Sequence, residues 1–422
     1  MNWQETCLGN HTDLISGATF KSAVFTDDEN DIPLIKGENI GQGKILWDKS
    51  RYWPADDIDQ YEKCWLKPGD VILAMDRPWV TAGLKFAQIK DSDPPSLLVQ
   101  RVARMRGTKG LETNYLRYIV GSKPFSDYVK NIMGGTNVPH ISGGQIRSYK
   151  FLLPPNGQQI NIIHHLKPYD DLIENNRRRI ALLEEAARQL YKEWFIRFRF
   201  PGHEHVNIVD GIPEGWVNQP LSQYIHIKHG YAFKGEYFSE DQTKRILLTP
   251  GNFKVGGGIK TEKLKYYSED GPLNEEYLLS KGDLILTMTD LSKTSDTLGY
   301  PLLVPSLRKI SFLHNQRIGK VDLKGKGYFP KFLFYHLFQD FRYRGHVVGS
   351  ATGTSVKHTS PAKICNYCPI IPWSLDDGLV RGFDEFAENN HQQILCLIEQ
   401  NDLLAQARDI LLPKLMNGEI AV

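Results

Sequence analysis

The sequence predicts an α+β protein. We expect two mixed α/β globular domains, related by a pseudo-twofold axis and separated by two long helices packed as an antiparallel coiled coil. Three observations predict this fold class: matched segments occur twice, glycine- and proline-rich parts contain short apolar runs, and each such part precedes a long run with helical spacing. The 422-residue chain is therefore expected to hold one unit of about half its length in two copies.

The duplication extends along the chain. The offset between matched segments drifts only between 213 and 218 positions. A drift of this size indicates a duplication followed by small loop insertions. The matched pairs include GTNVPHIS (135–142) with GTSVKHTS (353–360), GATFK (17–21) with GYAFK (230–234), GDVILAM (69–75) with GDLILTM (282–288), and QRV (100–102) with QRI (316–318).

Residues 1–153 and 205–370 are predicted to be the two globular domains. Their short β-prone runs are bounded by turn residues, as strands commonly are. The aromatic-rich stretches 115–132 and 329–341 carry apolar residues at i, i+3 and i+4, which predicts helices. The expected strands include 34–40, 71–75, 245–250 and 284–288.

Residues 154–204 are predicted to hold the first long helix, at about 158–197, and residues 371–422 the second long helix with a C-terminal tail. Alternating steps of three and four positions form a heptad seam, which is typical of a coiled coil. The alternative is that each helix packs only on its own domain. The predicted seam residues are Leu166, Ile173, Asn176, Ile180, Leu183, Leu190, Asn390, Ile394, Leu397 and Leu404.

The two helices are expected to be antiparallel, because a twofold axis perpendicular to a helix pair reverses one helix. Between positions 384 and 409 the second helix carries six acidic residues and one basic residue, Arg408. The first carries three consecutive arginines at 177–179, which could instead contact phosphate. We therefore expect an acidic helix beside a partly basic one, with Pro413 limiting the second helix near its end.

Composition narrows the class of protein only slightly. The net charge of +2 neither indicates nor excludes a nucleic-acid partner. No apolar run is long enough to cross a membrane, and the first ten residues lack a signal-peptide pattern. Five scattered cysteines, an odd number, fit a reducing compartment. We expect a cytoplasmic globular protein.

The motifs that carry chemistry are incomplete. GGGIKT (256–261) lacks the spacing of a phosphate-binding P-loop. Cys365 and Cys368 stand alone with His358 as the one nearby candidate, whereas zinc needs a fuller ligand set. We expect no catalytic residues and no metal site in this chain.

Polar and basic residues instead gather in loops at matching places of the two repeats. Hydroxyl, amide, imidazole and cationic groups on small residues suit close approach to phosphates and base edges. The alternative is a turn whose Thr and Asn side chains satisfy nearby backbone groups. The candidate DNA-binding residues are Lys21, Arg77, Lys85, Thr136, Asn137, His140, Lys234, Lys293, Thr294, Thr354, Ser355, Lys357 and His358.

The ordered, duplicated motifs resemble the specificity subunits of type I restriction–modification systems over the whole chain. Besides the matched pairs, the resemblance rests on W-x4-L near the start of each repeat, LLPP at 152–155, ENN at 174–176 and RDILLPKLMNGEI at 408–420. It implies two target-recognition domains, each reading one half of a split site in double-stranded DNA, with the helices setting the gap. The second helix departs from the pattern, with Asn401 and Arg408 where the first has Ala187 and Trp194.

The resemblance also implies the partners. Two methyltransferase subunits would dock on this chain, a restriction and translocase subunit would join them, and no membrane is involved. This chain would bind no cofactor, because S-adenosylmethionine, ATP and Mg²⁺ would belong to the partner subunits. Two alternatives remain: a single-chain restriction or modification enzyme, and a duplicated scaffold that holds proteins rather than DNA.

Overall fold

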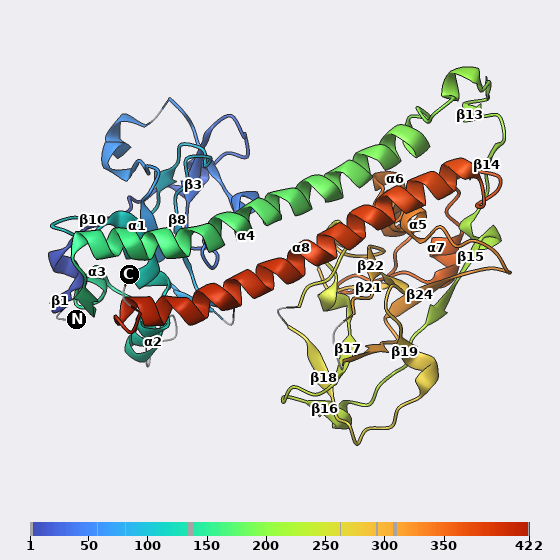
Figure 1. Ribbon diagram of the computed structural model, residues 1–422. Helices are drawn as coiled ribbons and strands as arrows, with labels where there is room; N and C mark the ends of the chain where they lie inside the picture. The colour runs from blue at the N-terminus through green and yellow to red at the C-terminus, as the bar shows by residue number, and fades with distance from the viewer. Residues whose placement is uncertain are drawn as a thin grey trace. The chain divides into compact units, whose positions relative to one another are not determined.

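The computed structural model describes residues 3–56, 58–80, 82–133, 139–261, 263–292, 294–306, 310–420 and 422. The chain divides into two compact units, one of Met1–Asn176 with Glu399–Val422 and the other of Arg177–Ile398. Each unit contains one mixed α/β domain and part of each of the two long helices, α4 (Asn156–Tyr191) and α8 (Gly378–Met416) (Figure 1).

The first unit is built on an antiparallel sheet of four strands. Their order is β2 (Thr12–Ser16), β10 (Val102–Gly107), β5 (Val71–Ala74) and β8 (Phe86–Gln88). All four side chains of β5 are buried, which explains its continuous apolar sequence. The smaller pairings join β4 (Tyr52–Trp53), β3 (Ile32–Ile35) and β9 (Leu97–Leu98), then β1 (Gln4–Cys7) with β11 (Lys150–Leu153), and β6 (Trp79–Val80) with β7 (Gly83–Leu84).

The helices of the first domain are shorter than the sequence predicts. The stretch 115–132 forms two helices, α1 (Thr113–Gly121) and α2 (Lys123–Ile132), rather than one. The break occurs because Ser122 is extended and its hydroxyl caps the second helix by accepting from the Phe125 amide. A third helix, α3 (Gly143–Arg147), begins with a capping box made by Ser142 and Gln145. The predicted strand 34–40 also ends early, at Ile35.

The second unit repeats this topology. Its four-stranded sheet has the order β15 (Ile225–His229), β24 (Ile318–Leu323), β20 (Leu284–Thr287) and β22 (Pro301–Leu303). A parallel pair, β17 (Arg245–Leu248) with β23 (Ser311–His314), matches the parallel pair of β3 and β9. The remaining strands are β16 (Phe238–Ser239), β18 (Lys265–Tyr267), β19 (Leu278–Leu279), β12 (Ile208–Val209), β13 (Ile212–Pro213), and β14 (Trp216–Asn218), which pairs with β26 (Ile370–Pro372) as β1 pairs with β11.

The stretch 329–341 is also divided. It forms α5 (Lys331–Leu337), after which Asp340 caps α6 (Phe341–Gly349) by accepting from the Arg342 amide. A short helix, α7 (Pro361–Cys365), follows at the position that α3 holds in the first unit. The same pairings and the same short helix in both units confirm that the duplication in sequence is a duplication of structure.

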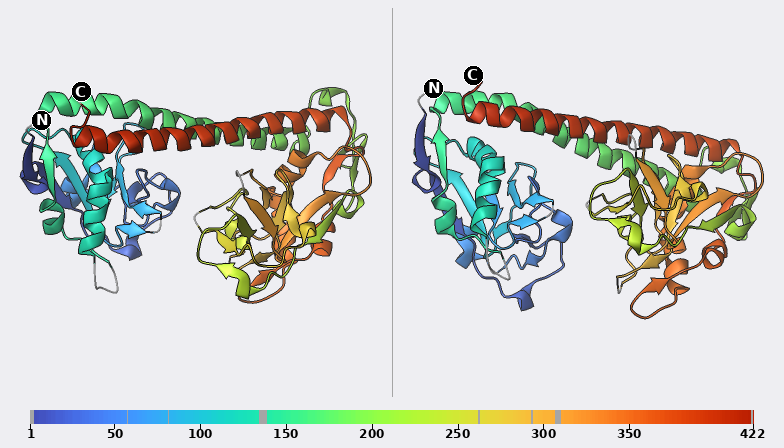
Figure 2. Two further views of the ribbon diagram at one scale, coloured as in Figure 1. Left: turned by 60° about the horizontal axis from the view of Figure 1, so that its bottom comes forward. Right: turned by 90° about the horizontal axis from the view of Figure 1, so that it is seen from below.

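Both long helices enter the core of each unit. In the first unit, Ile162 and Leu166 of α4 lie in one buried cluster with Leu412 and Leu415 of α8. In the second unit, the cluster combines Ala187 and Tyr191 of α4 with Val380, Phe383 and Ala387 of α8. The N-terminal part of α4 thus packs on the C-terminal part of α8, and the C-terminal part of α4 packs on the N-terminal part of α8. The two helices are therefore antiparallel where they pack. Both views of Figure 2 show α4 (green) and α8 (red) side by side.

The predicted seam positions are buried or half-buried on these helices. Leu166, Ile173, Asn176, Asn390, Ile394 and Leu397 are buried, and Ile180, Leu183, Leu190 and Leu404 are half-buried. Regular α-helix ends at Tyr191, earlier than predicted, and a π-helical turn continues to Ile196. Pro413 does not end α8, which continues to Met416. Pro168 likewise lies inside α4.

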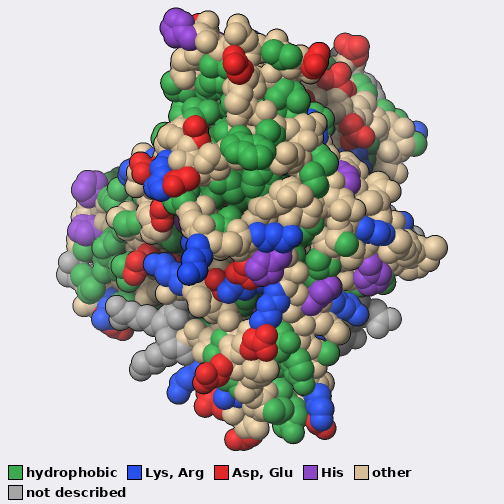
Figure 3. Space-filling model, turned by 90° about the vertical axis from the view of Figure 1, so that its right-hand side faces the viewer, with side chains coloured by type: hydrophobic (Ala, Val, Ile, Leu, Met, Phe, Trp, Pro, Cys, Tyr) green, Lys and Arg blue, Asp and Glu red, His purple; other side chains and the backbone are tan. Residues whose placement is uncertain are grey.

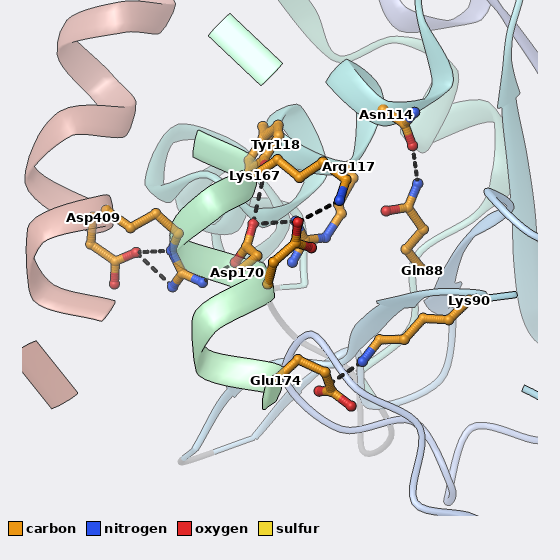
Figure 4. Close-up of polar contacts among 11 residues, drawn as sticks. Gln88, Lys90, Asn114, Arg117, Tyr118, Lys167, Asp170, Glu174 and Asp409 are labelled. Carbon is orange, nitrogen blue, oxygen red and sulfur yellow. Dashed lines mark hydrogen bonds and ion pairs between the residues drawn. The ribbon is translucent and has the colours of Figure 1, made fainter. Parts of the chain in front are cut away.

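One ion pair between the two helices has the opposite sign to the predicted charge pairing. Arg408, the one base of the acidic stretch of α8, donates to Asp170 of α4 over 2.7 Å, so the signs are reversed. The same carboxylate accepts from Arg117 and from the Tyr118 hydroxyl of α1, over 2.5 and 2.9 Å (Figure 4). Burial opposes the ionisation of Asp170, but the two arginines outweigh it and hold the pKa of this carboxyl below its usual value.

Asp384, a second charged residue of α8, is bonded to α5 of its own domain, although α4 was the expected partner. Asp384 accepts from the backbone amides of Phe332 and Leu333 over 2.7 and 2.9 Å, and so occupies the N-terminal end of α5. The Tyr328 hydroxyl donates to the same carboxylate over 2.9 Å. Burial raises the pKa of Asp384 despite these donors. This acid of α8 therefore stabilises its own domain.

Replacing both buried seam asparagines, Asn176→Leu with Asn390→Leu, is expected to raise the thermal unfolding temperature. Their exposed fractions are 6% and 7%, and a buried amide costs stability that an apolar residue recovers. The expected accompaniment is a broader distribution of oligomeric states, since a polar seam residue selects one register. Differential scanning calorimetry and light scattering measure both effects. A less stable but uniform double variant would contradict the seam role.

Asp170→Ala is expected to destabilise the first unit by about 3–5 kcal/mol, because it leaves two partly buried arginines without their shared carboxylate. Asp171→Ala is the matched control, since Asp171 is exposed and pairs with Lys167 along the same helix. Chemical denaturation of the two variants separates them. Equal stability of the two variants would show that the bridge contributes nothing.

Candidate nucleic-acid interface

Polar residues of the first unit meet at one end of its four-stranded sheet. Strands β2 and β5 end there and β10 begins there, because β10 runs antiparallel to both. The residues that follow β5 and precede β10 include Asp76 and Arg101. His140, from the distant segment before α3, forms an isolated bridge with Asp76.

Asp76 holds two basic side chains. Its carboxylate accepts from Arg101 Nη1 over 2.5 Å, and the other oxygen lies 2.7 Å from His140 Nδ1. Partial burial raises the pKa of Asp76, but the hydrogen bonds from Arg101 and His140 prevail and lower it. The carboxylate is therefore ionised at neutral pH and holds both groups at the sheet end.

Backbone hydrogen bonds fix the same junction. The Met75 amide donates to the Arg101 carbonyl, and the Ile141 amide donates to the Met75 carbonyl, each over 2.8 Å. The Arg77 amide donates to the Pro139 carbonyl over 2.7 Å. The structure thus brings together two segments that the sequence predicts as DNA-binding, the loop after β5 and the segment before α3.

The second unit builds the same junction from matching residues. The Met288 amide donates to the Arg317 carbonyl, and the Thr359 amide donates to the Met288 carbonyl, each over 3.0 Å. A short strand after β20, β21 (Thr289–Asp290), pairs with β25 (Lys357–His358). His358 Nδ1 lies 3.1 Å from the Thr289 hydroxyl, where the first unit places His140 on Asp76.

Glycine is required beside each junction. A Cβ on Gly17 would lie 2.4 Å from the carbonyl oxygens of Leu98 and Val99, and one on Gly230 would lie 2.3 Å from those of His314 and Asn315. No side chain fits at such distances from backbone oxygens. The matched glycines of GATFK and GYAFK therefore let the end of β2 or β15 approach the turn that carries the Gln-Arg pair.

Two further groups stabilise the second junction. Asp290 accepts from the backbone amides of Ser292 and Thr297, and although burial opposes ionisation, these bonds lower the pKa of its carboxyl. His314 is buried and its Nε2 lies 2.9 Å from the Ile318 carbonyl, so this nitrogen donates. Burial lowers the pKa of His314 to about 4, and the ring is neutral at pH 7.

The predicted DNA-binding residues divide by exposure. Lys21, Arg77, His140, Lys234, Thr294, Thr354, Ser355 and His358 are exposed, whereas Lys85 and Lys357 are half-buried. Thr136, Asn137 and Lys293 lie outside the described residues. The ammonium group of Lys85 donates to the Gly37 carbonyl, and burial lowers its pKa. Lys85 therefore braces the loop from inside, so it offers a ligand less than the sequence suggests.

Sequence reasoning missed the turns that precede β10 and β24. Gln100 and Arg101 are exposed in one unit, and Gln316 and Arg317 are exposed in the other. The duplication had marked both pairs, but an arginine on a short turn carries no motif of its own. Figure 3 shows one face of the protein on which Lys, Arg and His side chains gather near the middle, with Asp and Glu among them.

Other classes of site are not apparent in the part of the chain that the structure describes. No group of three or more His, Cys, Asp or Glu residues there is arranged to hold a metal ion. In the same residues, no helix combines the length and apolar character that a membrane crossing requires.

Comparison with known proteins agrees with the fold. Residues 1–185 match the family described as type I restriction modification DNA specificity domain. The MjaVIII type I restriction enzyme specificity subunit of Methanocaldococcus jannaschii is 31% identical over 190 residues, 45% of this chain and 44% of that protein. The MjaIX specificity subunit of the same organism is 26% identical over 328 residues, 74% of this chain and 70% of that protein. The match with the first relative thus spans less than half of its length.

A solved structure covers nearly the whole chain. The S subunit of a type I restriction–modification system from M. genitalium is 15% identical, with a TM-score of 0.55 over 98% of this chain and 96% of that one. The fold of this chain is therefore similar to that of this S subunit. Over residues 1–185 the chain is thus similar to the type I restriction modification DNA specificity domain, and the relatives that it matches over longer spans are specificity subunits.

Gly230→Ala is expected to destabilise the second unit by about 1–3 kcal/mol, because the added methyl meets two backbone oxygens and the strand end must shift. Gly235→Ala is the control in the same segment, since a Cβ there meets no atom within 4 Å. Thermal unfolding of the two variants measures the difference. Unchanged unfolding of Gly230→Ala would show that the strand end can move away at no cost.

Proposed function

We propose that this chain is the DNA-reading subunit of a type I restriction–modification complex and that each domain reads one part of a two-part site. One observation carries the proposal: the same junction, with exposed basic and polar side chains, is built at the same sheet end in both units. A duplicated frame with exposed side chains at one edge suits the recognition of two DNA segments.

The two parts of the site should differ. Asp76 of the first junction corresponds to Thr289 of the second, and Arg77 corresponds to Asp290. Side chains of opposite charge cannot make the same contacts to base edges. We therefore propose an asymmetric site rather than a palindrome.

The partners and cofactors are proposed from the net charge of the chain and from its resemblance to specificity subunits. A net charge of +2 offers limited neutralisation of phosphates, so tight binding would need partner subunits. We propose that two methyltransferase subunits and a restriction subunit supply it; in support, the relatives are named as specificity subunits of restriction enzymes. S-adenosylmethionine, ATP and Mg²⁺ would bind to those subunits, and this chain would be non-catalytic and act in the cytoplasm.

The helices are proposed to set the gap between the two parts of the site. A helix of 36 residues such as α4 is about 54 Å long at about 1.5 Å per residue. Major-groove faces on one side of a duplex recur about every 34 Å. The unspecified gap should therefore be a few base pairs wide, with the block centres about one turn apart.

Methylome sequencing of the host is expected to show one asymmetric, two-part site that disappears when the gene is deleted. Exchanging residues 76–85 for those of a relative should alter one block only. Inserting one heptad after Glu185 with a matching heptad after Glu388 keeps the seam in phase and should widen the gap by about 3 base pairs. The matched control is the heptad in α4 alone, which breaks the pairing and should abolish methylation. A palindromic wild-type site, or a double insertion that rewrote a block, would contradict the proposal.

A further inference from the structure

We propose that the exposed arginines of the two Gln-Arg turns, Arg101 and Arg317, each determine one base of the DNA site, and that Asp76 positions Arg101. This inference rests on the proposed function and names residues that read within it. Each arginine would present its guanidinium to the major-groove edge of a guanine, the base whose paired acceptors match that group.

Equivalent backbone hydrogen bonds fix the Gln100–Arg101 turn and the Gln316–Arg317 turn. The Gln100 amide donates to the Ala18 carbonyl over 2.7 Å, and the Gln316 amide donates to the Tyr231 carbonyl over 2.9 Å. The carbonyl of each arginine accepts from the amide of the methionine that follows the central strand, Met75 or Met288. With their backbone bonds directed inward, the turns leave the Gln and Arg side chains exposed.

Arg101 stands where glycine would be less strained. Its φ of 63° is in the left-handed region, which a residue with a Cβ rarely adopts. Strain of this kind costs of the order of 1–3 kcal/mol and collects at functional sites. The side chain is 64% exposed, so burial of the guanidinium does not offset that cost.

The ion pair with Asp76, called the clamp here, would hold the Arg101 side chain in place before DNA binds. Asp76, with 26% of its side chain exposed, engages Nη1 and is itself held by His140. Arginine has five donors, so the bond to Asp76 leaves donors for a ligand. Fixing a long side chain before binding removes part of the entropy that recognition would otherwise cost. The second unit lacks this clamp, because Thr289 replaces Asp76 and no ion pair to Arg317 is present among the described residues.

The test uses the full complex with its methyltransferase subunits and duplexes that carry the methylome site. Arg101→Ala is expected to weaken binding about 10- to 100-fold and to relax one position of one block, and Arg317→Ala to do the same in the other block. Arg51→Ala is the control, because Arg51 is similarly exposed but pairs with Asp27 rather than with Asp76. It should change neither affinity nor site, and thermal unfolding shows whether each variant is folded.

The positioning role is tested by a double-mutant cycle. Asp76→Asn should weaken binding several-fold in the wild-type background and much less in Arg101→Ala, because most of its effect acts through that arginine and only the rest through His140. Additive losses would overturn the positioning role. A wild-type two-part site that Arg101→Ala and Arg317→Ala leave unchanged, or weaken equally for every sequence, would overturn the inference alone. A wild-type complex that selects no sequence would overturn the proposed function with it.

Discussion

The antiparallel packing of α4 against α8 is the constraint on which the rest of the structure depends. In each unit the two helices complete the hydrophobic core of a domain, so neither domain is closed by its own sequence segment. Leu166 and Leu415, which share a core cluster, are far apart in sequence and almost inaccessible to solvent. Each such leucine contributes about 1.5–3 kcal/mol. The hydrophobic core of the first domain therefore includes the C-terminal part of α8.

Asp170 adds specificity to this packing rather than simple strength. A carboxylate with Arg117 on one side and Arg408 on the other joins α1, α4 and α8 at one point. Removing three charged groups from water costs about as much as their attraction returns. The hydrophobic cluster alone would tolerate small shifts of one helix along the other. The ion pairs of Asp170 oppose such a shift, because moving one helix by a turn would leave the partly buried Arg408 without its partner.

Much of the architecture could be predicted because it depends on periodicity and repetition. The three-four spacing locates the long helices, and the duplication predicts that GDVILAM and GDLILTM form equivalent buried strands, as they do. The failures concern contacts that periodicity does not encode. Counting charges along α8 did not predict the pair of Arg408 with Asp170, because only the register of the helices selects it. Lys85 bonds to the distant Gly37 carbonyl, and no local pattern relates these two residues.

The matched glycines, Gly17 and Gly230, show how the two junctions keep the same backbone structure while their exposed side chains differ. The groups that build each junction are backbone amides and carbonyls, which every residue type except proline supplies, and a glycine whose Cβ would collide. Substituting an exposed side chain there leaves these bonds intact. Thr289 in place of Asp76 changes what contacts the histidine without changing the pairing of the strands. Because the frame is made of backbone, the exposed side chains of either unit can change independently of the fold and of the other unit.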